Sequence, residues 1–185
     1  MKIVRALPGD AAALSSVARD AKGHWGYPED WLRRWDAVLT LTPAYVAAHP
    51  TYALVSDGTV LGFLALVLHG RTAQLDHLWV RPSAMGQGLG RRLFEFAEEV
   101  ARSAGAATLK VESDPHAEKF YVRMGAIRCG EVPAAMDGVE RHLVLLEKAL
   151  APRPAFAPQD ASGGLRISGN QGHSGAGSLQ RGRKP

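Results

Sequence analysis

Cysteine is nearly absent from this chain, which has a single thiol, Cys129, among 185 residues. One cysteine cannot form an internal disulfide, and nothing around it suggests an activating base, so we expect a small buried thiol on a strand. The first residues, Met1-Lys-Ile-Val-Arg5, do not form a basic and then apolar leader, and no apolar run approaches the ~20 residues of a membrane span. A reducing cytoplasm without membrane attachment is the expected setting.

Metal-ligand and hydrolase motifs are also missing. The seven histidines are scattered, and His69 and His77 have no carboxylate partner at a recognisable ligand spacing, so no metal site is predicted. A Ser-His-Asp hydrolase lacks support because no G-x-S-x-G elbow occurs.

Excess basic charge is confined to one end of the chain. The net charge is +4, yet residues 1–150 carry equal numbers of acidic and basic side chains, and the excess comes from residues 151–185. Pro, Gly, Ser and Ala dominate that segment, so we expect one domain at 1–150 followed by a disordered basic tail at 151–185. Its sparse cluster Arg181–Lys184 is more typical of a solubilising terminus than of a nucleic-acid or membrane contact.

The clearest functional signal is a short glycine-rich stretch, Met85-Gly-Gln-Gly-Leu-Gly90. It lies between a strand-like run at 75–80 and a helix-like run that begins at Arg91. Three glycines at alternate positions let backbone N–H groups at a helix start converge on anionic oxygens. A nucleotide P-loop is excluded because Arg91 and Arg92 stand where Lys and Ser or Thr are needed, and the dinucleotide fingerprint lacks its third glycine. Anionic-ligand binding is therefore expected.

Two segments together resemble the GNAT superfamily of N-acetyltransferases. The glycine stretch resembles its pyrophosphate-binding motif R/Q-x-x-G-x-G/A, with Met85 in place of the usual Arg or Gln. Residues 111–126 resemble its N-x-x-A-x-x-F-Y-x-x-x-G-F segment, where His116 replaces the commoner Asn and Ala126 the commoner Phe. The positions in step with this pattern are Ala117, Phe120, Tyr121, Gly125 and Ala126. The resemblance covers most of residues 1–148.

This resemblance implies an α/β (mixed α+β) fold with a twisted, mostly antiparallel sheet of about seven strands. About four helices would flank the sheet, which would splay between its fourth and fifth strands. Acetyl-coenzyme A would be the acyl donor, and an amine would attack it directly in a ternary complex. The coenzyme-binding residues that the resemblance implies are Leu78, Trp79, Val80, Met85, Gly86, Gln87, Gly88, Leu89, Gly90, Arg91, His116, Ala117 and Phe120.

Tyr121 is the candidate general acid. It matches the Tyr of the family's Phe-Tyr pair, which commonly points at the coenzyme sulfur, and a phenol with a pKa near 10 suits protonation of a thiolate. It also lies on an apolar stripe with Ala117, Phe120 and Met124, so it is equally a candidate core aromatic. The two interpretations are compatible.

Asp76 is the candidate general base. Strand alternation predicts that it shares a face with Leu78 and Val80, where a carboxylate is costly unless it is paired or used. Its place four residues before the strand-ending Val resembles that of the Glu of polyamine acetyltransferases, and the shorter Asp would work through a water. The alternative is a carboxylate that anchors a neighbouring Arg or a loop amide. His77 is expected to point the opposite way and to pack under a helix.

The amine-acceptor side is expected around His24, Trp25 and Tyr27, whose aromatic faces could receive a cationic amine or a flat acceptor. His24 could also serve as a base, and Glu112 and Asp114 are expected close to the cleft. A non-catalytic acyl-coenzyme A sensor and a protein N-terminal acetyltransferase remain alternatives. The acceptor is not defined, and a homodimer through the final strand is possible.

Periodicity and turn residues predict the remaining elements. Strands are expected at 2–7, 51–56, 59–68, 72–81, 108–112, 127–132 and 139–147, with the Asp57-Gly58 hairpin turn as the strongest local signal. One helix would run from Asp10 to about Ala21 with Ala12, Ala13, Val17 and Ala18 buried, and others would begin at Pro28, near Leu89 and at His116. The helix from Pro28 would carry Trp31, Trp35 and Val38, with the two tryptophans in the core.

Overall fold

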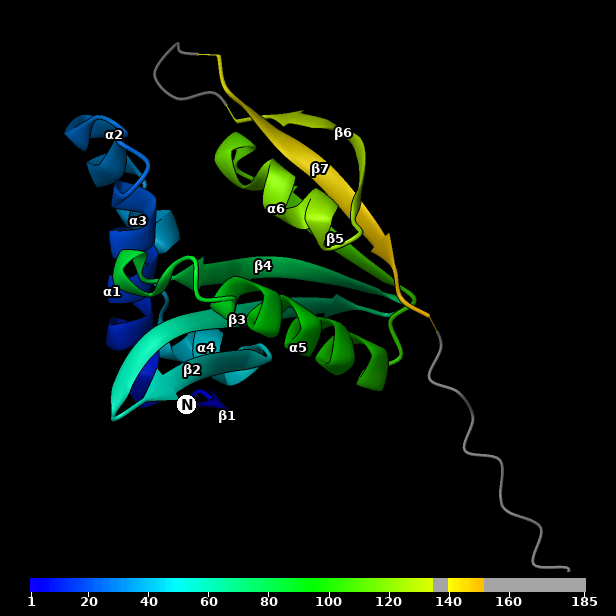
Figure 1. Cartoon of the computed structure of the whole chain (residues 1–185), viewed down its shortest axis with the longest axis horizontal. Helices are drawn as coiled ribbons and strands as arrows, with labels where there is room; N and C mark the ends of the chain where they lie inside the picture. Colours follow the sequence, from blue (N-terminus) through cyan, green and yellow to red (C-terminus); the bar gives the residue numbers. More distant parts are fainter. Residues whose placement is uncertain (135–139, 152–185) are drawn as a thin grey trace, which may run out of the picture. The chain divides into compact units, whose positions relative to one another are not determined.

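The computed structural model describes residues 1–134 and 140–151, and seven strands of this part form a single sheet in the order β1-β2-β3-β4-β5-β7-β6 (Figure 1). The pair β4 and β5 is parallel, and every other neighbouring pair is antiparallel. The strands are β1 (Lys2–Arg5), β2 (Thr51–Ser56), β3 (Thr59–His69), β4 (Thr72–Val80), β5 (Thr108–Ser113), β6 (Ile127–Pro133) and β7 (His142–Ala149). The expected mixed, mostly antiparallel sheet is confirmed.

The sheet splits between β4 and β5. Their pairing covers only residues 72–75 against 108–111, although β4 continues to Val80 and β5 to Ser113. Figure 1 shows β5 and β7 diverging from β4 beyond this short pairing. The edge of β4 past Leu75 is therefore without a β5 partner in the described part of the chain, and the predicted splay is confirmed.

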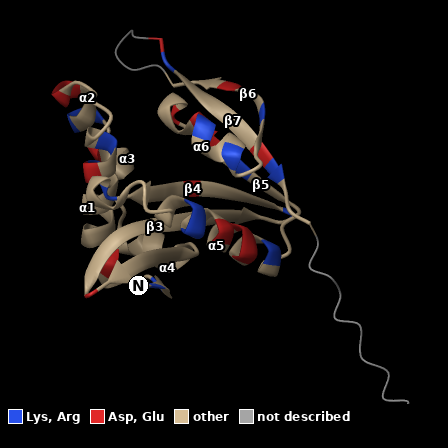
Figure 2. Cartoon of the chain, in the orientation of Figure 1, with Lys and Arg blue, Asp and Glu red and all other residues tan. Residues whose placement is uncertain are grey.

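Helices cover the two faces of the sheet and bury two cores. On one face lie α5 (Leu89–Ser103) and α6 (Glu118–Arg123), and on the other lie α1 (Ala11–Gly23) and α4 (Pro43–Ala48). The central strand β3 is apolar on both sides, because Leu64 and Leu66 pack under α5 while Phe63 packs under α1 and α4. In Figure 2 the charged residues of α5 are blue at its start and end and red between.

The tight turns formed as predicted. Asp57 and Gly58 have φ values of 48° and 76°, the left-handed pair that a two-residue hairpin turn requires, and they join β2 to β3. Gly70 has a φ of 57° in the turn between β3 and β4. Three short 3-10 turns occur at Pro8–Asp10, Pro82–Ala84 and Pro115–Ala117.

The segment before β2 differs most from the expectations. In α1 the predicted burial of Val17 and Ala18 is confirmed, whereas Ala12 and Ala13 are exposed and Ala11 and Leu14 are buried in the first turn instead. The helix expected from Pro28 is interrupted at Trp35 into α2 (Glu29–Arg34) and α3 (Asp36–Leu39), and α4 was not predicted.

Side-chain burial corrects the expectations for two tryptophans and for Cys129. Trp31 and Trp35 are only partly buried, and Val38, farther along the same segment, is 67% exposed. Cys129 lies on a strand as expected but is exposed, because it is the extra residue at a register shift of the edge strand β6, between Arg128 and Gly130. The predicted tail, apart from Ala151, and the first residue of the strand expected at 139–147 lie outside the described residues.

No helix within residues 1–134 and 140–151 combines the length and the apolar character that crossing a membrane requires.

Candidate active site

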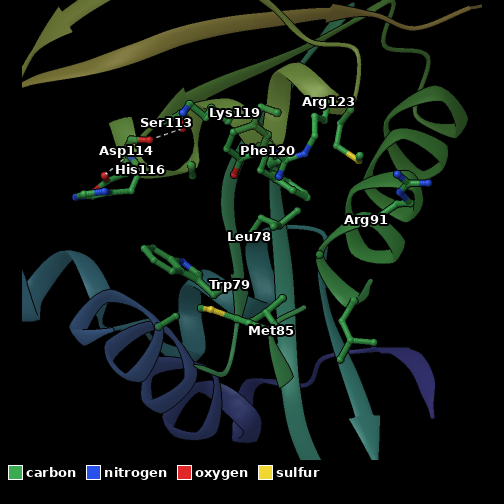
Figure 3. A pocket seen from close by; sticks show the side chains of 18 of the residues that line it. Leu78, Trp79, Met85, Arg91, Ser113, Asp114, His116, Lys119, Phe120 and Arg123 are labelled. Atoms are coloured by element: carbon green, nitrogen blue, oxygen red, sulfur yellow. Dashed lines mark hydrogen bonds between the residues drawn. The ribbon is translucent and has the colours of Figure 1, made fainter. Parts of the chain in front are cut away.

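A cavity of about 630 Å³ opens where β4 and β5 diverge. Figure 3 shows its walls: β4, the glycine loop before α5, and α6 with the end of β5. Asp76 and Tyr121 both line it. So do twelve of the thirteen expected coenzyme contacts: Leu78, Trp79, Val80, Met85, Gly86, Gly88, Leu89, Gly90, Arg91, His116, Ala117 and Phe120. The exception is Gln87, whose side-chain amide donates to the Ser83 carbonyl at 3.3 Å.

The glycine loop has the backbone geometry of an anion cradle. Gly86 and Gly88 have φ values of 76° and 77°, which side-chain-bearing residues rarely adopt. Gly88 is the N-cap of α5, and no side chain in the described ranges caps this helix start. The first N–H groups of a fifteen-residue helix therefore face the cavity, where the positive end of the helix dipole favours an anion.

Gly90 serves packing instead. A Cβ atom there would lie 3.3 Å from Cε2 of Phe120, so the glycine allows α5 to approach α6 closely. This contact joins the two segments that carry the sequence resemblance. Met85, the irregular member of the loop, packs partly buried against the same core and lines the cavity.

Tyr121 is a core aromatic, as one of its two interpretations predicted, and it also lies at the cavity wall. It is 7% exposed and packs against Phe94 and Phe120, with ring centroids 5.9 and 5.0 Å away, yet it also lines the cavity. Burial raises the pKa of Tyr121 well above the ordinary phenol value, so the side chain holds its proton throughout the physiological range.

Asp76 faces a different direction from the one predicted. The register between β3 and β4 shifts at this point, so that Ala65 pairs with His77 and Leu66 with Leu75, and Asp76 is the extra residue of a β-bulge. Its carboxylate accepts a hydrogen bond from the Tyr45 hydroxyl on α4, and Oδ2 lies 3.5 Å from Nε2 of His77. Simple alternation was therefore wrong for Asp76, which turns toward α4 while still lining the cavity.

His77 and Tyr45 form the surroundings of that carboxylate. The His77 ring packs edge-on against Tyr45, with centroids 5.6 Å apart, so the expected packing under a helix is confirmed, although His77 does not point away from Asp76. Its Nδ1 accepts a hydrogen bond from Nε1 of Trp79 at 3.1 Å, which places the proton of the neutral ring on Nε2, toward Asp76. Burial lowers the pKa of His77, with the Asp76 charge opposing it in part. Burial and the bond to Asp76 raise the pKa of Tyr45.

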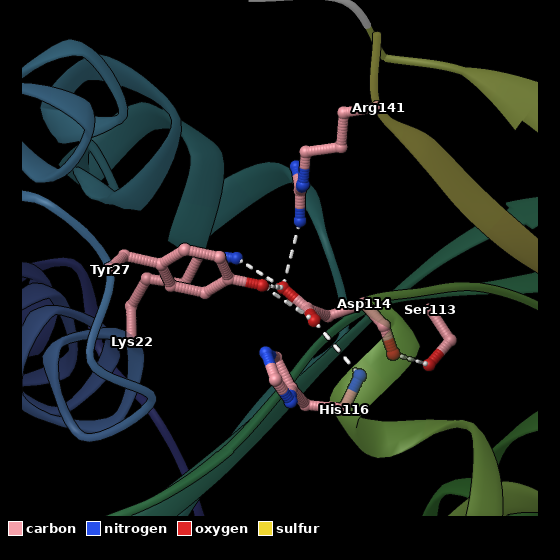
Figure 4. Close-up of polar contacts among 6 residues, drawn as sticks. All are labelled: Lys22, Tyr27, Ser113, Asp114, His116 and Arg141. Carbon is pink, nitrogen blue, oxygen red and sulfur yellow. Dashed lines mark hydrogen bonds and ion pairs between the residues drawn. The ribbon is translucent and has the colours of Figure 1, made fainter. Parts of the chain in front are cut away.

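A second polar cluster surrounds Asp114, just after β5 (Figure 4). Oδ2 of Asp114 lies 2.5 Å from Nζ of Lys22 and 2.8 Å from a guanidinium nitrogen of Arg141. The Tyr27 hydroxyl donates to the carboxylate at 2.8 Å, and the His116 backbone N–H donates at 3.1 Å. We call Lys22, Tyr27, Asp114 and Arg141 the Asp114 cluster. It ties the end of α1 to the ends of β5 and β7.

Burial and the ion pairs have opposite effects on the pKa values of Asp114 and Lys22. Burial would raise the pKa of Asp114, but the hydrogen bond and charge of Lys22, together with the hydrogen bonds from the His116 N–H and the Tyr27 hydroxyl, outweigh it, so the pKa lies below the ordinary value. Burial lowers the pKa of Lys22, and its bond to Asp114 offsets only part of that effect. Burial and the Asp114 contact raise the pKa of Tyr27 to about 12, so the phenol remains a donor.

The expected acceptor residues are distributed unevenly around the cavity. Of His24, Trp25 and Tyr27, Trp25 lines it, and its ring stacks on His116 with centroids 5.2 Å apart and an interplanar angle of 5°. His24 packs edge-on against Trp25, and Tyr27 is engaged by Asp114. Glu112 and Asp114 line the cavity as expected.

Three residues of the site were not found from the sequence. Lys22, Tyr45 and Arg141 reach Asp114 or Asp76 from segments far away in the chain, and no local pattern marks them. Among residues 1–134 and 140–151, no group of three or more His, Cys, Asp or Glu side chains is arranged to hold a metal ion.

The fold is a sheet that splits at a cavity, and the glycine loop at that cavity has the geometry of an anion-binding site. Comparisons with known proteins identify the family of proteins to which this arrangement belongs. The model of the acetyltransferase (GNAT) family matches residues 13–126, and the chain belongs to this family. It is accordingly an acyltransferase, as the resemblance implied.

One relative and two solved structures illustrate the likeness. A blasticidin-S acetyltransferase of Streptomyces morookaense is 35% identical over 112 residues, which are 60% of this chain and 81% of that protein. A GCN5-related N-acetyltransferase of Rhodopseudomonas palustris superimposes with a TM-score of 0.69 at 23% identity, over 80% of this chain and 95% of the other. The PaiA N-acetyltransferase of Thermoplasma acidophilum, solved with coenzyme A, gives 0.64 at 19% identity, over 80% and 98%. Both structural likenesses establish the fold.

Proposed function

We propose that this protein transfers the acetyl group of acetyl-coenzyme A to a primary amine of a small molecule, by direct attack in a ternary complex. The observation that carries the proposal is the meeting of an anion cradle, a carboxylate and a protonated phenol in the cavity where β4 and β5 diverge. The blasticidin-S acetyltransferase that resembles this chain bears the name of a small-molecule acceptor, which supports the substrate class.

The residues of the cavity fit the coenzyme. The left-handed glycines 86 and 88 and the uncapped start of α5 would hold the pyrophosphate through backbone N–H groups, with Arg91 beside them. The unpaired edge of β4 past Leu75 offers further N–H groups to the extended arm of the donor. The PaiA structure with coenzyme A supports this choice of donor.

Acyl transfer to an amine needs a base, an oxyanion site and an acid. Asp76, directly or through a water, would take a proton from the acceptor ammonium, and the free amine would attack the thioester carbonyl. Backbone N–H groups near residues 78–80 would stabilise the tetrahedral oxyanion. Collapse of this intermediate breaks the C–S bond, and Tyr121 would protonate the leaving thiolate. The nitrogen, which still carries one proton too many, would release it through solvent water to the Tyr121 phenolate, which leaves the neutral amide and the free thiol.

Release of free thiol, measured with a panel of amines, tests these roles. We expect Tyr121→Phe and Asp76→Asn each to lower kcat by about a hundredfold, the lower end of the effect of a general acid or base. Coenzyme affinity, measured by calorimetry, should stay unchanged.

Two variants serve as matched controls. Tyr52→Phe removes the hydroxyl of a tyrosine that packs against Phe96 away from the cavity, and Asp57→Asn changes a hairpin-turn residue that tolerates Asn. Both should retain full activity. Tight coenzyme binding without turnover of any amine would instead indicate a non-catalytic acyl-coenzyme A sensor. Peptides that outcompete every small amine would indicate a protein N-terminal acetyltransferase.

A further inference from the structure

The Asp114 cluster contains more positive than negative charge. Lys22 and Arg141 are both cations, and both contact the same oxygen of the single carboxylate Asp114. The remaining member, Tyr27, is a neutral hydrogen-bond donor. Within these four described residues one positive charge is not matched by a negative one.

This excess charge is largely removed from solvent. The side chains of Lys22, Arg141 and Asp114 are 8%, 12% and 14% exposed. The Lys22 ammonium lies 4.1 Å from the ring centre of Trp35, and the Arg141 guanidinium carbon lies 4.8 Å from it. Aromatic faces stabilise cations but carry no net charge, so the imbalance persists in a site where unpaired charge is expensive.

Two of the four members of the cluster, Lys22 and Asp114, reach the cavity wall, and Tyr27 and Arg141 contact Asp114 without lining the cavity themselves. Lys22 and Asp114 line the cavity together with Trp25 and His116, away from the glycine loop. The other acid on this part of the wall is Glu112, and no hydrogen bond or ion pair in the described ranges joins it to Lys22 or Arg141.

We propose that the Asp114 cluster binds an anionic group of the acceptor, a carboxylate, so that the substrate is an amine that also bears a carboxylate. Lys22 supplies a compact point charge at the cavity wall, and the guanidinium of Arg141, bonded to the same Asp114 oxygen, supplies the second positive charge that this one carboxylate does not balance. The amine end of the same molecule is then directed toward Asp76, which also lines the cavity. This inference rests on the proposed function and narrows its substrate class.

Matched pairs of amines test the inference. Each pair is an ω-amino acid and its carboxamide of the same chain length, over a series of lengths, so that the members differ in the charge at one end. Their binding is measured by calorimetry with and without coenzyme A, and their acetylation by thiol release. For the best length we expect the carboxylate member to bind about tenfold more tightly and to show a correspondingly higher kcat/KM.

Arg141→Gln should abolish this preference by weakening the carboxylate member about tenfold, with the carboxamide unchanged. Lys110→Gln is the control, because it removes the same charge from an exposed ion pair with Glu147 that is not part of the Asp114 cluster. It should leave the preference intact. Arg141→Lys, which retains the charge, should keep most of the preference and replaces Arg141→Gln if that variant does not fold.

Equal binding of the paired amines to the unaltered protein at every length would overturn the inference. An equal loss of preference in Arg141→Gln and Lys110→Gln would also overturn it, because the preference would then depend on the net charge of the protein and not on the Asp114 cluster. Acetylation of amines without any carboxylate preference would refute the inference and leave the proposed function standing. A calorimetric carboxylate preference without acetylation of any amine would support the inference and refute the proposed function.

Discussion

The two sides of the cavity are built in different ways. The coenzyme side, from the glycine loop to α5 and α6, depends on backbone: two left-handed glycines, an uncapped helix start, and a third glycine that lets Phe120 approach. The acceptor side depends on side chains that come from α1, α4 and the ends of β5 and β7, and that meet at Asp76 and Asp114.

This difference separates the binding of the acyl donor, which depends on backbone, from the choice of acceptor, which depends on side chains. Backbone N–H groups are present whatever the side chains are. The coenzyme side therefore tolerates changes of side chain, provided that the glycines remain. The side chains of the acceptor side come from four segments and contact one another, so their combination sets the acceptor. Each prediction below perturbs one of the two sides.

The largest effect is expected on stability, from Asp114→Ala. The substitution leaves Lys22 and Arg141 buried without a carboxylate, and removing one partner of such a group costs about 3–5 kcal/mol in the free energy of unfolding. Denaturant unfolding measures this. Glu147→Ala, which breaks the exposed pair with Lys110, is the control and should cost under about 1 kcal/mol. Equal losses in the two variants would mean that the Asp114 cluster does not hold the acceptor side together.

On the coenzyme side, Gly88→Ala should weaken coenzyme binding. Alanine at a φ of 77° is strained by about 1–2 kcal/mol, so the loop would move away from the geometry that presents its N–H groups. We expect roughly a tenfold loss of coenzyme affinity by calorimetry. Gly9→Ala is the control, because a Cβ there meets nothing within 4 Å and its φ is not positive. Unchanged affinity in Gly88→Ala would show that the cradle does not bind the coenzyme.

The glycine loop and the helix that follows it could be predicted from the sequence because their signals are local. A left-handed pair such as Asp57-Gly58, or glycines that precede a helix, can be recognised within a few residues. The acceptor side could not be predicted, since Lys22 and Asp114 are 92 positions apart and their pairing depends on the finished fold. The direction of Asp76 was predicted wrongly because a β-bulge adds one residue to β4. Strict alternation of side chains along a strand does not account for such an extra residue.

A smaller effect is expected from Tyr45→Phe on the acceptor side. Loss of the hydroxyl removes a hydrogen bond that fixes the Asp76 carboxylate, and a net contribution of ~1 kcal/mol corresponds to about a fivefold lower kcat. The Michaelis constant for the coenzyme should not change. In an Asp76→Asn background, Tyr45→Phe should cause no further loss, because the two side chains act as one unit. Additive losses would place Tyr45 in a role independent of Asp76.

The smallest effect concerns the dependence of stability on pH. Burial lowers the pKa of His77 below 6.5, so near and below that pH the unfolded chain binds a proton that the folded protein excludes. The free energy of unfolding should therefore fall as the pH drops from 6.5 toward the lowered pKa, and His77→Gln should flatten this slope. Denaturant unfolding at several pH values measures it, with His142→Gln, an exposed position on β7, as the control. If the slope of His77→Gln matched that of the unaltered protein, the ring beside Asp76 would be open to protonation. The acceptor side would then be wetter than its packing against Tyr45 and Trp79 implies.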